Sequence, residues 1–93
     1  MDFEGDENKN RANIKKHGVS FLEAQTVFYD PLAKVALDSD NSDLEDRFIA
    51  VGHSSSLRQL LVVHCCRKSS RMIRIISARK LTRTEKGQYE GML

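Results

Sequence analysis

The sequence predicts an α+β fold in which two N-terminal helices pack on a three- to four-stranded antiparallel sheet, followed by a short C-terminal helix. Three observations predict it: helix-capping motifs in the first third of the chain, β-rich runs in the middle, and another capping motif after the last run. The chain has 93 residues, so we expect residues 1–93 to form one domain with a single modest core.

Two helices are predicted before residue 31. Asp6 is suited to cap the N-terminus of a helix over residues 7–17. Ser20 and Glu23 form an S-x-x-E capping box that begins a second helix, and this helix ends before Pro31.

The middle of the chain is rich in β-branched residues. Its candidate strands are residues 34–38, 47–53, 60–66 and 71–78. Short polar turns separate the last three, so consecutive strands are predicted to pair as antiparallel hairpins. The first five residues are either a short strand or a tail. Thr82 and Glu85 form the capping box that begins the C-terminal helix.

The formal net charge of +2 hides a strong asymmetry along the chain. Residues 1–46 hold five basic and eleven acidic residues, whereas residues 47–93 hold ten basic and two acidic residues. A basic half of this size is typical of proteins that bind nucleic acid. Eight of the fifteen basic residues are arginines, whose guanidinium fork suits bidentate contacts with phosphate.

Several cations are candidates for phosphate contacts. Lys9, Asn13 and Lys16 fall within about 60° of arc on the first helix, which is either a cationic ridge or an ordinary solvated face. The second half adds cations on strands and turns, namely Arg47, Arg58, Arg74, Arg79, Lys80 and Arg83. Each arginine contacts a phosphate or pairs with the acidic segment 38–46, which is predicted to be a solvated loop. Alternation along the last strand places Arg74 on the same face as Ala78.

Other classes of site are not indicated. The sequence contains no glycine-rich phosphate loop, no G-x-S-x-G motif and no carboxylate cluster suited to Mg²⁺. Successive residues of a strand point to opposite faces, so His64, Cys65 and Cys66 cannot converge on a metal, and both cysteines are expected to be reduced and buried. We expect a cytoplasmic protein without a cofactor, because no apolar run is long enough for a membrane span and no leader follows Met1.

The cations are compatible with metal-free cleavage of RNA, because the 2′-OH of RNA can attack the adjacent phosphorus. The protein must then supply a base, an acid and cations that stabilise the transition state. The base remains open among Lys16, His17, His53 and His64. Glu85 is better explained as a helix cap than as a base.

Two blocks of the sequence resemble a known family. The pattern K-x-x-x-N-x-x-K-H-G-V-S-F over residues 9–21 and the run I-I-S-A-R over residues 75–79 are similar to the BrnT family of toxins, and the similarity extends roughly from Phe3 to Tyr89. The resemblance implies a fold like that of RelE-type ribonuclease toxins. It also implies a bacterial type II toxin that cleaves RNA and inhibits translation. A BrnA-like antitoxin with a ribbon-helix-helix DNA-binding portion would neutralise it, within a higher-order complex.

The resemblance also implies roles for individual residues. The catalytic candidates are Lys16, His17, Arg47 and Arg79, and the candidates for RNA contacts are Lys9, Arg58, Arg74, Lys80 and Arg83. No metal ligand is implied. Two alternatives remain, namely a nucleic-acid-binding module without catalysis and a protein-interaction module, either of which would be an inactive remnant of a toxin.

Overall fold

A computed structural model of the chain describes residues 1–38, 47–67 and 71–93. The elements, in chain order, are β1 (Asp2–Glu4), α1 (Glu7–His17), α2 (Phe21–Thr26), the 3₁₀ helix η1 (Val27–Tyr29), β2 (Lys34–Leu37), β3 (Arg47–His53), β4 (Gln59–Arg67), β5 (Met72–Lys80) and α3 (Arg83–Gly91). The predicted helices and strands are therefore confirmed, with small shifts at their ends. The predicted acidic loop lies outside the described residues, apart from Asp38.

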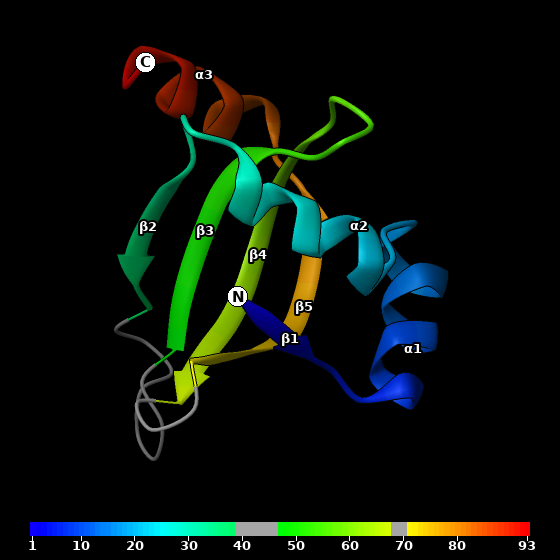
Figure 1. Cartoon of the computed structure of the whole chain (residues 1–93). Helices are drawn as coiled ribbons and strands as arrows, with labels where there is room; N and C mark the ends of the chain where they lie inside the picture. The colour runs from blue at the N-terminus through cyan, green and yellow to red at the C-terminus, as the bar shows by residue number, and fades with distance from the viewer. Residues whose placement is uncertain (39–46, 68–70) are drawn as a thin grey trace.

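The strands form one five-stranded sheet in the order β1-β5-β4-β3-β2 (Figure 1). Neighbouring strands are antiparallel, except that β1 pairs with β5 in parallel. The α+β class is confirmed, but the prediction of a purely antiparallel sheet of three or four strands was wrong. Hairpin reasoning applies only to strands that follow one another, whereas most of the chain separates β1 from β5.

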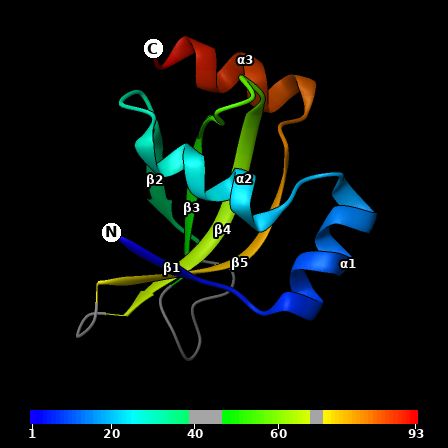
Figure 2. The same cartoon turned by 45° about the vertical axis from the view of Figure 1, so that its right-hand side comes forward.

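The helices surround the sheet on three sides. Helix α2 and η1 cover one face, α1 lies beside β5, and α3 lies across the end at which β3 and β5 finish (Figures 1 and 2). The core lies between α2 and the sheet and consists of Val19, Phe21, Ala24, Val27, Ala50, Leu60, Val62, Ile75 and Ala78. Gly52 allows η1 to approach β3 closely, because a Cβ at this position would lie 3.2 Å from Val27 Cγ1.

A β-bulge in β5 changes which side chains share a face. Val63 of β4 faces Ser77, but the next residue, His64, faces Ile75, so Ile76 is the extra residue. Simple alternation therefore fails at Ile76, and the prediction that Arg74 shares a face with Ala78 was wrong. The bulge places Arg74 on the same face as Arg79 instead.

The two capping motifs behave differently. Thr82 and Glu85 form a complete capping box at the start of α3. Ser20 Oγ accepts a hydrogen bond from the Glu23 backbone N–H at 3.0 Å, but the Glu23 carboxylate does not return to Ser20. It binds Arg58 instead, so the box predicted for α2 is only half formed.

The amide of Asn13 joins α1 to the edge of β5. This side chain is buried, and its Nδ2 donates to the carbonyl oxygens of Val19 and Ala78, each at 2.8 Å. Its Oδ1 accepts from the Ala78 N–H at 3.1 Å. The predicted ridge on α1 is therefore wrong at its centre, because Asn13 faces the sheet while Lys9 and Lys16 on either side of it are exposed.

Replacing Asn13 by alanine should lower the free energy of unfolding by about 2–4 kcal/mol, because buried backbone groups of Val19 and Ala78 would lose their partners. Chemical denaturation of the purified protein measures this change. Asn8→Ala on the exposed side of α1 is the matched control and should change stability by less than about 0.5 kcal/mol. Equal stability of the two variants would contradict the role assigned to Asn13.

Candidate functional site

The face of the sheet opposite α2 carries three of the nine predicted site residues, namely Arg47, Arg74 and Arg79, and we call it the open face. The register across β3, β4 and β5 orders this face into the rows Arg47–Cys65–Arg74, Ile49–Val63–Ser77 and Val51–Leu61–Arg79, followed by the pair His53–Gln59. The apolar side chains in these rows are half-buried, apart from Cys65, which is buried. Three arginines that are distant in sequence thus share one surface.

Arg79 is held in place by α3. Its two terminal nitrogens donate to the two carboxylate oxygens of Glu85 at 2.7 and 2.9 Å. Hydrogen bonds from Arg79 are the largest cause that lowers the pKa of Glu85, to about 2. Glu85 is therefore ionised at neutral pH and too weakly basic to accept a proton readily, which leaves it to cap α3 and orient Arg79. The Arg79 side chain is still 36% exposed.

Arg74 and Lys9 line the same hollow beside β5. The Arg74 Nε donates to Glu4 Oε1 at 3.2 Å, which links β5 to β1. A hollow between the N-terminal segment and β5 is lined by Glu4, Gly5, Asp6, Lys9, Arg74, Ile75 and Ile76. The fold therefore brings together two cations that are 65 positions apart in the sequence.

Arg58 connects the β3–β4 turn to the helices. Its Nε donates to Glu23 Oε2 at 2.9 Å, a terminal nitrogen binds the other oxygen of Glu23, and the same nitrogen donates to the Gly18 carbonyl at 3.0 Å. Hydrogen bonding to Arg58 lowers the pKa of Glu23. These contacts give Arg58 a structural role, while its predicted contact with RNA stays a prediction.

His53 has the surroundings of a positioned base, although the leading candidates from the sequence did not include it. Its backbone N–H donates to Asp30 Oδ2 at 2.7 Å, and its Nδ1 lies 3.4 Å from the same oxygen. Its Nε2 lies 3.3 Å from Gln59 Nε2, and its ring centroid is 5.8 Å from that of Tyr89. The side chain remains 33% exposed. In the sequence, Asp30 signalled only the end of a helix.

A cleft runs beside His53 between the β3–β4 turn and α3. Its lining residues are His53, Leu57, Arg58, Gln59, Lys80, Lys86 and Glu90. Helix α3 contributes Lys86 and Glu90 to this lining, and Glu90 accepts a hydrogen bond from Gln59. The same helix binds Arg79 through Glu85 and packs on His53 through Tyr89. Helix α3 thus links Arg79 to the His53 cleft.

The catalytic candidates of the sequence are only partly brought together. Lys16 and His17 end α1, one turn after the Asn13 contact with β5, and Lys16 is exposed while His17 is half-buried. Arg47 begins β3, at the end of the sheet opposite to the one that carries His53 and Arg79. From strand geometry, the Cα atoms of Arg47 and Arg79 are roughly 16 Å apart. Arg83, in the first turn of α3, is exposed.

His64 belongs to the core. It is 4% exposed, its ring centroid lies 4.7 Å from that of Phe28 and 5.9 Å from that of Phe48, and burial lowers its pKa. Cys65 is buried as expected, but Cys66 is exposed, because it points to the other side of the sheet at the end of β4.

The described part of the chain offers neither a metal-binding cluster nor a membrane-spanning helix. Within residues 1–38, 47–67 and 71–93, no group of three or more His, Cys, Asp or Glu residues is arranged to hold a metal ion. No helix in this described part of the chain is long and apolar enough to cross a membrane.

Comparison with known proteins identifies the class of this fold and then the family. Residues 6–85 match the family described as the ribonuclease toxin BrnT of type II toxin-antitoxin systems. The structure is similar to the crystal structure of the Brucella abortus ribonuclease toxin BrnT, with a TM-score of 0.67 and 26% identity, over 89% of this chain and 99% of that chain. No significant match was found among curated proteins. The chain therefore belongs to the BrnT family of ribonuclease toxins, and its partner class is a type II antitoxin.

The ion pair between Glu85 and Arg79 predicts a pH-dependent stability. Because the pKa of Glu85 falls from 4.5 to about 2 on folding, the pair stabilises the fold fully above pH 4.5, and this stabilisation is lost as the pH falls towards 2. After allowance for solvent screening, the contribution should be about 1–2 kcal/mol.

Denaturation of the Glu85→Gln variant between pH 2 and 7 tests this prediction. The variant should lose stability at neutral pH and show a shallower fall at acid pH than the parent protein. Glu7→Gln changes a carboxylate that is 67% exposed and should leave the curve nearly unchanged. Parallel curves for Glu85→Gln and the parent would contradict the assignment.

Proposed function

We propose that this protein is a metal-independent endoribonuclease that acts in the cytoplasm and inhibits translation. We propose further that a BrnA-like antitoxin with a ribbon-helix-helix portion neutralises it in a higher-order complex. The observation that carries the catalytic proposal is that Arg47, Arg74 and Arg79 share the open face through the register of three strands and the bulge at Ile76. A single-stranded RNA laid across this face would meet cations along its backbone.

The proposed reaction is transesterification within the RNA. A base removes the proton of a 2′-OH, the 2′-oxygen forms a bond to the adjacent phosphorus, and the bond from phosphorus to the 5′-oxygen breaks. The products are a 2′,3′-cyclic phosphate and a 5′-OH end, which receives a proton from an acid. Cations positioned near the phosphorus stabilise the additional negative charge of the transition state.

The surroundings of the candidates support different roles for them. His53 is the proposed base, because it is partly exposed and oriented by the Asp30 carboxylate. Arg79 is proposed to stabilise the phosphorane charge, since Glu85 fixes its guanidinium while several N–H donors remain. The rest of the RNA strand is proposed to contact two further groups of cations through its phosphates. Those near Arg79 are Lys16, His17, Lys80, Lys86 and Arg83, and those towards the other end of the sheet are Arg47, Arg74 and Lys9.

Purified protein should cleave single-stranded RNA in the presence of EDTA, and Arg79→Ala should reduce the rate at least about 100-fold, because a positioned charge donor is lost. Gel analysis of a labelled RNA measures both. Arg11→Ala is the control, because Arg11 is an exposed α1 arginine that also pairs with a carboxylate, and it should retain nearly the full rate.

A second control separates catalysis from folding. Glu85→Ala removes the same ion pair but keeps the Arg79 cation, so it should destabilise the protein as Arg79→Ala does while retaining more activity. Equal activity of Arg79→Ala and the parent would contradict the assigned role. RNA binding with a steep salt dependence but no cleavage would instead favour the non-catalytic nucleic-acid-binding module.

The assignment of the base predicts which histidine controls the chemical step. His53→Ala should lower the single-turnover rate at least about 100-fold and leave RNA affinity nearly unchanged, because the proton acceptor is lost. His17→Ala should lower RNA affinity more than the single-turnover rate. A larger loss of the single-turnover rate in His17→Ala than in His53→Ala would place the base on α1.

A further inference from the structure

The two edges of the sheet differ in whether their outward N–H and C=O groups are bound within the fold. One row crosses the sheet from Ala78 through Val62 and Ala50 to Val35. At the β5 edge, the N–H and C=O of Ala78 are both bound by the buried amide of Asn13. At the β2 edge, the row ends at Val35, and no other described residue pairs with the outer side of this strand.

The hydrogen-bonding pattern shows which groups of β2 point away from the sheet. The Asp38 N–H donates to the Arg47 carbonyl at 2.7 Å, so bonded pairs with β3 alternate back along β2 at Ala36 and Lys34. The N–H and C=O groups of Val35 and Leu37 therefore point outwards. The row that starts at Ala78 gives the same result independently. The N–H and C=O of Ala78 point away from β4, so those of Val62 and Ala50 point towards each other. The N–H and C=O of Val35, which faces Ala50, therefore point outwards.

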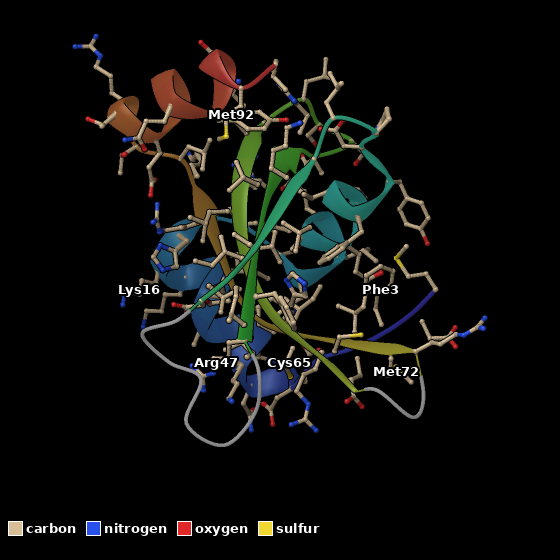
Figure 3. All side chains as sticks on the ribbon, turned by 90° about the vertical axis from the view of Figure 1, so that its left-hand side faces the viewer. Phe3, Lys16, Arg47, Cys65, Met72 and Met92 are labelled. Atoms are coloured by element: carbon tan, nitrogen blue, oxygen red, sulfur yellow. The ribbon has the colours of Figure 1, made fainter. Side chains whose placement is uncertain are left out.

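The side chains beside this edge are apolar on one face. Val35 and Leu37 are 59% and 54% exposed. Lys34 and Ala36 point to the other face. Figure 3 views the molecule from the β2 side, and the β2 ribbon crosses the front of the view, with no described segment in front of it.

This surface suits a peptide strand rather than RNA. It offers outward main-chain donors and acceptors next to apolar side chains, which is how sheet edges bind extended segments of other proteins. Among the described residues of β2, the one cation is Lys34, and its side chain lies on the opposite face from Val35 and Leu37. Three of the cations proposed to bind RNA, Arg47, Arg74 and Arg79, lie on the open face instead.

We propose that the outer edge of β2 binds an extended segment of the protein antitoxin, which adds a sixth strand to the sheet. The inference rests on membership of a type II toxin family and not on the proposed catalytic residues. The segment would alternate apolar residues, packed beside Val35 and Leu37, with polar residues that include a carboxylate opposite Lys34.

Amide hydrogen exchange tests the proposal directly, using the toxin alone and in complex with the product of the neighbouring antitoxin gene. In the free toxin, the amides of Lys34 and Ala36 should be protected and those of Val35 and Leu37 should exchange rapidly. In the complex, the exchange of Val35 and Leu37 should slow at least about tenfold. Unchanged exchange at both residues in a saturated complex would overturn the proposal.

A substitution provides the second test. Val35→Pro removes an outward N–H without removing a bond to β3, so it should weaken antitoxin binding at least about tenfold in calorimetry while the free toxin keeps its circular dichroism spectrum. Leu37→Lys should weaken binding similarly. The control is Leu22→Lys, which alters a leucine that is 73% exposed on α2, and its affinity should be unchanged.

The remaining outcomes separate this proposal from its competitors. If the free toxin sediments as a dimer that Val35→Pro dissociates, while antitoxin affinity is unchanged, the edge serves a second copy and the proposal is overturned. If Val35 and Leu37 become protected in the complex although the free toxin cleaves no RNA, the docking proposal is supported and only the proposed catalysis fails.

Discussion

The arrangement of this small protein depends on one buried amide. Asn13 binds both main-chain groups of Ala78 and the carbonyl of Val19, so it fixes α1 against β5 and sets the turn that leads into α2. An asparagine in this position replaces the hydrogen bonds that another strand would have made. The contact sets the distance between the end of α1 and the sheet, and it therefore positions Lys16 and His17 relative to the open face.

The second constraint is the bulge at Ile76, which determines what the open face presents. Without the extra residue, Arg74 and Arg79 would point to opposite sides of the sheet. With it, both lie on the face that also carries Arg47, and each forms an ion pair with a glutamate from another element, Glu4 or Glu85. Arginines from the basic half of the chain thus lie on one surface, and Glu4 and Glu85 hold two of them in place.

Local features of the sequence were sufficient to predict the helices and most strands. The helix over residues 7–17 and the strand over 47–53 were predicted correctly, because caps and β-branched runs act over a few residues. The misses all depend on contacts between distant residues: the parallel pairing of β1, the bulge in β5, and the attraction of the Glu23 carboxylate to Arg58. The orientation of His53 by Asp30 had no local signal either. The two blocks that carry the family resemblance, residues 9–21 and 75–79, contain Asn13 and Ala78, which bind each other in the fold.

The proposed RNA-binding surface is the open face and not the α2 side of the sheet. The most direct measurement is an NMR titration of the protein with a short 2′-O-methyl RNA, which cannot be cleaved because its 2′-oxygen carries no proton. We expect the largest chemical-shift changes along the rows of the open face, at Ile49, Val63 and Ser77 and at the arginines beside them. Changes concentrated on α2 and η1, with the open face unaffected at saturation, would contradict it.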